Sequence, residues 1–203
     1  MENYLDSVIK QFKYYEGLGR ATMEQIDESS LFYEPADDTN SIAIIVKHLH
    51  GNMLSRWKDF LTTDGEKKWR KRDEEFEGTL SNRKEVYQLW NEGWECLYKA
   101  IEPLKPEQLD QIIYIRNEGH TVMEAINRQL CHYIYHIGQI VFLGKIVTSS
   151  NWVSLSIPKG KSKDFNKNKF AQKKSGKVKW TDEEVEKLEQ IRMTLIKSLK
   201  SQT

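Results

Sequence analysis

Two histidines stand four positions apart in "HYIYHIGQIVFLGK", residues 132–145, a stretch that is otherwise mostly apolar or aromatic. In an α-helix, positions i and i+4 lie on one face with their Cβ atoms about 5–6 Å apart. His132 and His136 could therefore bind one metal ion together. They could equally be two core histidines that are hydrogen-bonded separately, and an isolated HxxxH pattern by itself favours that second interpretation.

A third histidine on another predicted helix shifts the balance toward a metal. His48 lies on the apolar face of its helix, whereas His50 falls away from that face. Three imidazoles from two helices leave coordination positions open for water or substrate, as a catalytic metal ion requires. The sequence therefore predicts one divalent transition metal (zinc, nickel or iron) held by His48, His132 and His136.

The pattern differs from two other kinds of metal site. Position 133 is a tyrosine, so the helix lacks the glutamate that serves as general base in an HExxH metalloprotease. No dense set of carboxylates accompanies the histidines, and this disfavours a di-iron centre. A single ion fits the sequence better than either alternative.

Three amides are placed to support the predicted site. Gln129 and Gln139 lie three positions from a histidine on either side, and Asn52 comes one helical turn after His48. These amides could hold the imidazole rings or a bound small molecule. They could also be ordinary polar groups of the bundle, and the sequence does not decide between the two roles.

Arginines and tyrosines near the site have less certain roles. Arg56 could bind an anionic co-substrate through its guanidinium group. Arg70 and Arg72 could do the same, although a solvated charged loop is the simpler interpretation for both. Tyr133 and Tyr135 are expected to point away from the face that carries the histidines and to serve packing.

Four amphipathic segments must position these residues, because apolar side chains repeat at helical spacing in each of them. The segments are residues 2–26, 40–61, 82–101 and 121–148. Asn82 and Thr121 each precede a glutamate by three positions and are expected N-caps, and Thr39 or Asn40 is expected to cap the second helix. A short extended segment with a turn at residues 117–119 precedes the fourth helix. The fold class predicted is all-α, a four-helix bundle.

The charge pattern divides the chain into three parts. Residues 1–158 form the predicted bundle and carry a net charge of −6. Residues 159–179 contain nine lysines and one aspartate, a net charge of +8, and are predicted to be a flexible linker. Residues 180–203 are predicted to form an additional helix, capped by Thr181. Its narrow apolar seam could dock on the bundle or pair with another subunit, so a homodimer is expected.

The cellular location follows from what the chain lacks. Cys96 and Cys131 lie 35 positions apart in helical patterns and form no CxxC pair, as is usual for thiols of a reducing compartment. We found no secretory signal and no apolar run long enough to span a bilayer. A cytoplasmic protein without membrane contact is expected.

Three stretches resemble a bacterial branch of the DinB-like superfamily. They are "SIAIIVKHLHGNMLSRWKDFLTTDGEKKWRKRDEEFE", "HTVMEAINRQLCHYIYHIGQIVFLGK" and "WVSLSIPKGKSKDFN". The resemblance covers about residues 1–166. It implies a four-helix bundle in which a histidine triad binds one divalent metal, with His48, His132 and His136 in the places of the triad. His50 stands where a small residue would be expected, so the motif leaves the choice between His48 and His50 open.

Relatives of this bundle include transferases that use bacillithiol or mycothiol, and mycothiol-dependent isomerases. The resemblance therefore implies an enzyme that transfers a small thiol to an electrophile at the metal. The same site could instead ionise water and act as a metal-dependent hydrolase. A third hypothesis is a non-enzymatic, stress-related protein that binds nucleic acid through its lysines, which would be salt-sensitive and indifferent to sequence. Few aromatic residues are interleaved with these lysines, so nucleic acid is the least expected partner.

Overall fold

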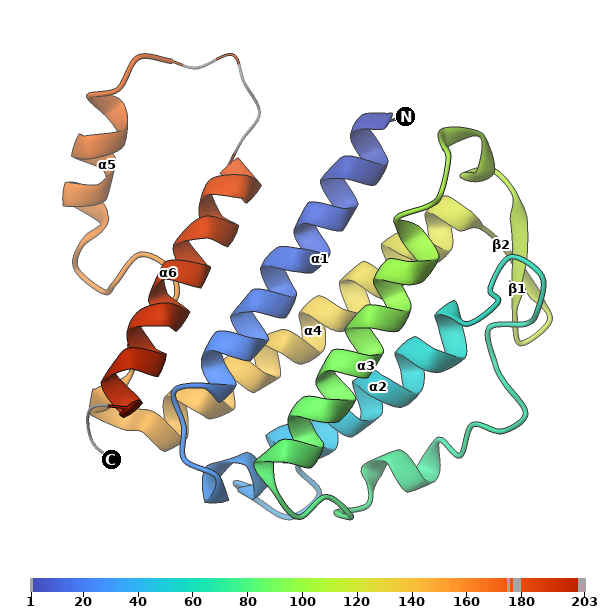
Figure 1. Ribbon diagram of the computed structural model, residues 1–203, viewed down its shortest axis with the longest axis horizontal. Helices are drawn as coiled ribbons and strands as arrows, with labels where there is room; N and C mark the ends of the chain where they lie inside the picture. The colour runs from blue at the N-terminus through green and yellow to red at the C-terminus, as the bar shows by residue number, and fades with distance from the viewer. Residues whose placement is uncertain (1, 175, 177–179, 201–203) are drawn as a thin grey trace.

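The computed structural model describes residues 2–174, 176 and 180–200 and confirms the all-α fold class. Figure 1 shows the arrangement. The helices are α1 Glu2–Met23, α2 Ile42–Trp57, α3 Arg83–Ile101, α4 Val122–Thr148, α5 Ser162–Phe170 and α6 Trp180–Lys200. The strands are β1 Ile112–Ile115 and β2 Glu118–Thr121, and the 3-10 helices are η1 Ser29–Phe32, η2 Asp73–Phe76, η3 Pro106–Gln108 and η4 Ser149–Asn151.

Helices α1 to α4 close into the predicted four-helix bundle. α1 packs against α3 and α4, and α2 packs against the same two helices from the other side. The centre is aromatic, with Phe12, Trp94 and Tyr133 in mutual ring contact and almost no exposed surface. Gly19 lets Trp90 approach α1, because a Cβ at this position would overlap the Trp90 ring. Burial of these large rings stabilises the bundle.

Side-chain caps fix where the helices begin, mostly as predicted. Asn82 accepts a hydrogen bond from the backbone N–H of Glu85 at 3.0 Å, and Thr121 accepts one from that of Glu124 at 3.0 Å. The prediction for α2 was wrong by one or two residues, since Ser41 is its N-cap. α2 also ends earlier than predicted, at Trp57, because the chain turns out of the helix at the next residue.

A small hairpin follows α3 and stands beside the end of α2 (Figure 1). β1 and β2 pair antiparallel around Arg116 and Asn117, whose φ values of 57° and 63° place both in the left-handed region. The expected turn at residues 117–119 thus lies slightly earlier in the chain. The Asp64 carboxylate accepts hydrogen bonds of 2.8 Å from both turn N–H groups. Asp64 therefore ties the hairpin to the connection that follows α2.

Replacing Asp64 with asparagine should lower the free energy of unfolding by about 1 kcal/mol, because an amide cannot accept both hydrogen bonds as a carboxylate does. Burial raises the pKa of Asp64, but hydrogen bonds from the backbone N–H groups of Asn117, Glu66 and Arg116 outweigh it and hold the pKa below its usual value. The stabilisation is therefore complete above about pH 4 and is lost as the pH falls through the lower folded pKa.

Urea unfolding at neutral and acidic pH checks this expectation. The Asp64→Asn variant should differ from the wild type near neutrality and converge with it in acid. The exposed Asp110, changed to asparagine, is the matched control and should behave as wild type at both pH values. A difference that grows in acid would contradict the assigned role of Asp64.

Helix α6 docks on the bundle within the same chain. It lies along α1 (Figure 1). Leu188 of α6 is buried among Tyr14, Ala21 and Leu155. Arg192 adds a bidentate pair to Glu24, with both N···O distances 2.8 Å. The apolar seam of α6, on which the prediction of a homodimer was based, thus packs against α1 of the same chain. The dimer itself stays a prediction.

The lysine-rich segment contains a helix that the sequence analysis did not predict. α5 occupies residues Ser162–Phe170, and Figure 1 shows it beyond α6, away from the four bundle helices. Thr181 lies inside α6, which begins at Trp180. Residues 175, 177–179 and 201–203 of the predicted linker and last helix lie outside the described residues.

One stretch of the described chain, Val122–Asn151, is long and apolar enough to cross a membrane, although the sequence analysis found no such run. Core helices of soluble proteins pass the same test. Ile126, Ile137 and Ile140 of this stretch are buried in the bundle. Packing against α1 and α2 accounts for only part of this apolar composition, since 28% of the 18-residue apolar window is buried.

Candidate metal centre

Three histidine rings meet between α2 and α4. The Nε2 atom of His132 lies 3.3 Å from that of His48 and 3.1 Å from that of His136. One nitrogen of each ring lies within 4.8 Å of the other two. His50 is not in this group, because its Nε2 faces Glu92 on α3 at 3.2 Å. The fold thus separates the two histidines of α2 as the helical-face argument predicted.

The nitrogen spacing fits a shared metal ion. Zinc binds imidazole nitrogen at about 2.0–2.1 Å, so two such nitrogens lie about 2.8–3.0 Å apart at octahedral angles and about 3.3–3.4 Å apart at tetrahedral angles. The observed separations of 3.1 and 3.3 Å lie within the limits that these two geometries set. Two unprotonated imidazole nitrogens at this distance repel each other unless a cation lies between them. The donor set is therefore suited to one divalent transition metal.

Hydrogen bonds on the outer edge of two rings fix the tautomer. His48 Nδ1 donates to Glu75 Oε2 at 2.9 Å, since a carboxylate oxygen can only accept. His136 Nδ1 donates to the amide oxygen of Gln139 at 2.9 Å. When Nδ1 carries the proton and Nε2 does not, the Nε2 lone pair of each ring can point at the ion. The predicted supporting role of Gln139 thus has a structural counterpart.

Glu75 is itself held in place by a buried arginine. Arg70 donates to the two carboxylate oxygens, from Nε at 2.7 Å and from Nη2 at 2.9 Å. Burial raises the pKa of Glu75, but hydrogen bonds from His48 and Arg70 lower it overall. Gly51, three residues after His48, provides the space, because a Cβ there would overlap Glu75 Oε1. The Arg70–Glu75–His48 chain orients one candidate ligand from outside the site.

The surroundings keep two of the imidazoles, those of His132 and His136, neutral. Burial, together with His136 and His48, lowers the pKa of His132 to about 3. Burial and His48 lower the pKa of His136 to about 4, although the hydrogen bond to Gln139 acts in the opposite sense. Both rings therefore carry free lone pairs at neutral pH, the state that a metal ion binds.

Two of the predicted amides lie in the wall beside the triad. Asn52 is buried, and its Oδ1 accepts a hydrogen bond of 3.2 Å from the Tyr133 hydroxyl. That hydroxyl in turn accepts a hydrogen bond of 2.9 Å from Trp57 Nε1. Gln129 is 3% exposed, and its Oε1 has no hydrogen-bond partner in the described part of the chain. His132 Nδ1 is likewise buried and has no hydrogen-bond partner among the described residues. Since buried polar atoms rarely stay unpaired, both atoms are suited to a water or a ligand.

A cavity of about 370 Å³ opens directly onto the three histidines. Asn52 and Gln129 line it, together with Phe76, which stacks on the His48 ring at a centroid distance of 4.9 Å. Its other lining residues include the arginines at positions 56, 70, 72, 116 and 128. Within the described residues, no aspartate or glutamate lines it. A small molecule in this cavity would touch the metal site and a positively charged wall.

Two sequence-based interpretations need correction, and a third stays a prediction. Arg56 lines the cavity as a residue that could bind an anion, and its guanidinium also binds the Gly65 carbonyl and the Glu66 carboxylate. Arg70 is not in a solvated loop, since only 2% of its side chain is exposed. Tyr135 does not point away from the site but lines the cavity, whereas Tyr133 is buried in the core as expected.

Several residues of the site were missed in the sequence. Glu75 and Phe76 belong to η2, inside a charged stretch that resembles a solvated connection. Arg116 lies on the hairpin turn, and Arg128 lies on α4 one turn before His132. Arg128 could have been found from the sequence, because positions 128, 132 and 136 are spaced four residues apart and share one helix face.

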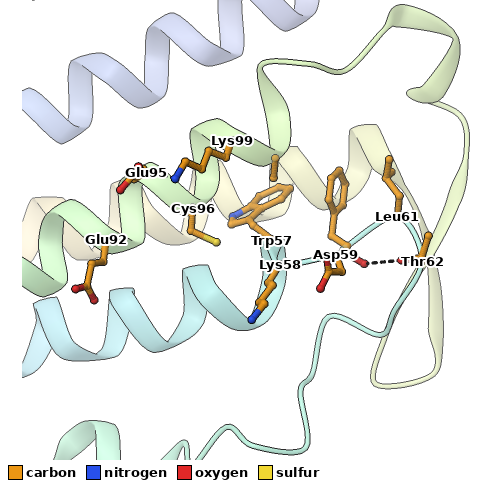
Figure 2. A pocket seen from close by; sticks show the side chains of 11 residues that line it. Trp57, Lys58, Asp59, Leu61, Thr62, Glu92, Glu95, Cys96 and Lys99 are labelled. Atoms are coloured by element: carbon orange, nitrogen blue, oxygen red, sulfur yellow. Dashed lines mark hydrogen bonds and ion pairs between the residues drawn. The ribbon is translucent and has the colours of Figure 1, made fainter.

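A second cavity, of about 570 Å³, contains a cysteine, and among the described residues no group of metal ligands converges on it (Figure 2). Cys96 lines it from α3 beside Trp57, and Glu92, Glu95 and Lys99 stand along the same helix. Cys96 Sγ lies 4.0 Å from the Met53 carbonyl oxygen. Burial raises the pKa of the Cys96 thiol, which disfavours the reactive thiolate. The histidines are therefore better suited to chemistry than Cys96.

Cys131 should react with iodoacetamide about tenfold faster than Cys96 near neutral pH, because thiol reactivity follows exposure and thiolate content. Cys131 is exposed, whereas Cys96 is half-buried and has a raised pKa. Time-resolved peptide mass spectrometry of the native protein measures the two rates, and unfolding in urea should equalise them. Faster alkylation of Cys96 would assign it a chemical role that its surroundings do not support.

Comparison with known proteins gives one match. A family model described as "Protein of unknown function (DUF1572)" matches residues 1–161. The matched region contains the four bundle helices, the hairpin, η2 and all three histidines, and it ends before α5. A search of curated proteins and a search of solved structures each found no match.

Proposed function

The chain belongs to the DUF1572 family, and from this membership and its histidine triad we propose a metal-dependent enzyme of the DinB-like kind that transfers a small thiol to an electrophile. One observation carries the proposal. Three imidazoles converge at the wall of a cavity of small-molecule size, with His132 Nε2 3.3 Å from His48 Nε2 and 3.1 Å from His136 Nε2, and one nitrogen of each ring within 4.8 Å of the other two. This arrangement leaves room for a thiol beside the ion.

The reaction is a substitution at the electrophile. The sulfur of the thiol forms a bond to the electrophilic carbon, the leaving group departs with the bonding electron pair, and the thiol proton is released to solvent. A divalent ion bound at the triad would supply a positive charge that favours the thiolate, the nucleophilic form of the thiol. We place this reaction in the cytoplasm, where small thiols stay reduced.

The chain's own residues have three tasks in this proposal. Glu75 and Gln139 hold two imidazole rings in the orientation that presents Nε2 to the site. Gln129 offers an unpaired buried acceptor to the bound molecule. Phe76 covers His48 and keeps water from that side of the triad.

Hydrolysis uses the same metal position but finds less support in the site. A hydrolase needs a base to take the proton of the attacking water. The cavity is not lined by a carboxylate among the described residues, and Glu75 is occupied by Arg70 and His48. Thiol transfer needs no such base, because the thiol ionises more readily than water.

The direct test begins with protein purified without chelator. Metal analysis should find about one transition-metal ion per chain, as a single three-histidine site predicts. Incubation with a bromobimane electrophile should then give a conjugate only in the presence of added thiol, and removal of the metal should stop it. Absence of a stoichiometric metal, or turnover of ester substrates without thiol, would contradict the proposal.

A further inference from the structure

Positive charge is concentrated around the cavity in an otherwise acidic domain. Residues 1–158 carry a net charge of −6, yet five arginines and no carboxylate line the cavity within the described chain. The arginines are Arg56, Arg70, Arg72, Arg116 and Arg128. They come from α2, the connection around η2, the hairpin turn and α4, so the fold brings together cations that are far apart in sequence.

Three of these arginines are anchored behind the cavity wall by two glutamates. Glu66 Oε2 lies 3.2 Å from Arg56 Nη1 and 3.1 Å from Arg116 Nη2. Arg70 binds Glu75 at 2.7 Å and lies 3.6 Å from Glu66. The negative charge of two carboxylates thus cancels only part of the positive charge of three guanidinium groups. The two glutamates hold the wall in place, and the wall keeps a net positive charge.

The other two arginines are free to bind a ligand. Arg72 and Arg128 are exposed, and neither has a carboxylate partner within 4.0 Å among the residues described. The Arg72 guanidinium lies over the Phe76 ring, 5.3 Å from its centroid. Arg128 precedes His132 by four residues on α4 and shares its helix face. The pair flanks the triad from two different elements.

A metal site does not by itself explain this wall. A divalent ion on three neutral imidazoles would add positive charge to a region that already has an excess of it. Nearby guanidinium groups would weaken its binding unless the cavity also receives negative charge. Guanidinium groups bind carboxylate and phosphate oxygens in a bidentate manner, which makes them suited to such a ligand.

We propose that the small molecule brought to the histidine triad is an acidic thiol, whose carboxylate or phosphate group is bound by Arg72 and Arg128 while its sulfur faces the histidines. The thiol part rests on the proposed function. The anionic part rests on the arginines, and it distinguishes the substrate from neutral thiols of the same size. The cavity of about 370 Å³ limits the ligand to a small molecule.

The test compares two thiols that differ in charge, using the full chain loaded with cobalt(II). Mercaptosuccinate carries two carboxylates, and 2-mercaptoethanol carries none. Their binding is followed by the sulfur-to-cobalt absorption in the near ultraviolet. The affinity for mercaptosuccinate should be at least about tenfold higher than that for 2-mercaptoethanol, and a higher salt concentration should reduce this difference.

The Arg72→Gln, Arg128→Gln double variant should lose most of the preference while its affinity for 2-mercaptoethanol stays within about twofold. The control is Lys84→Gln, Lys99→Gln, which removes the same charge from exposed positions that do not line the cavity. Succinate and inorganic phosphate, added as competitors, show which oxyanion the wall prefers. Circular dichroism verifies folding, and Arg128→Gln alone replaces the double variant if that variant does not fold.

The outcomes separate the two proposals. Equal affinity for both thiols, or a preference that survives the double variant, overturns the acidic-thiol inference and leaves thiol transfer intact. If the chain takes up no metal or shows no sulfur absorption, thiol transfer fails. Calorimetry of the metal-free chain with succinate and phosphate then decides the anion site, because binding that disappears in the double variant supports it and no binding by the wild type overturns it.

Discussion

Replacing His132 with alanine is expected to abolish stoichiometric metal binding. His132 Nε2 stands between those of the other two ligands, at 3.3 and 3.1 Å, so its loss leaves two imidazoles that no longer share a third neighbour. Loss of a group that only supports a ligand costs about 10–100-fold in metal affinity. Loss of a ligand should cost more, and dialysed protein should retain almost no metal by elemental analysis.

The metal-free fold should tolerate this change. His132 Nδ1 is buried without a partner among the described residues, and burial lowers the pKa of the ring, so the imidazole is poorly solvated in the folded state. Alanine also suits a helix interior. The metal-free variant should therefore unfold at a temperature similar to or above that of the metal-free wild type. Added metal should raise the midpoint only in the wild type.

His50→Ala is the matched control, because His50 lies on the same helix as His48 but faces Glu92 on α3. It should keep the metal content and the metal-dependent rise in the unfolding midpoint. Full metal content in His132→Ala, or its loss in His50→Ala, would show that the ion binds elsewhere. This comparison also settles the choice between His48 and His50 that the motif left open.

The sequence predicted the triad because helical periodicity carries enough information for it. His132 and His136 need only a helix to share a face, and the apolar pattern of α4 fixes which face turns inward. The same reasoning placed His48 inside the bundle and His50 outside the triad. Gln139 also followed from spacing, since position i+3 on a helix reaches the ring of His136.

The outer parts of the site could not be predicted in this way. Glu75 approaches His48 through η2, a segment without helical periodicity whose many charges resemble a solvated loop. What folds it onto α2 is a set of specific contacts, with Lys47 bound to the Glu74 and Glu77 carbonyls and Phe76 stacked on His48. Such contacts depend on three-dimensional arrangement, and no local pattern encodes them. Arg116 reaches the cavity for the same reason, through a hairpin turn pinned by Asp64.

Glu75→Gln is expected to weaken metal binding about 10–100-fold without removing a ligand. A neutral amide is a weaker acceptor for His48 Nδ1–H, so the imidazole becomes a poorer donor to the ion and its ring is less firmly oriented. The change also leaves Arg70, whose side chain is 2% exposed, without its closest carboxylate. Glu66, 3.6 Å away, compensates in part, so the free energy of unfolding should fall by about 2–3 kcal/mol, below the usual cost of breaking a buried pair.

Gly51→Ala tests the same contact without altering charge. A methyl group on Gly51 would overlap Glu75 Oε1 and displace the carboxylate from His48, so metal affinity should fall although every ligand and Glu75 itself remain. Isothermal titration with zinc measures both variants, and Gly138→Ala, at a helical glycine with open space around it, is the control. If Glu75→Gln and Gly51→Ala both bind zinc as the wild type does, Glu75 serves only to neutralise Arg70, and the orientation of His48 must come from Phe76 alone.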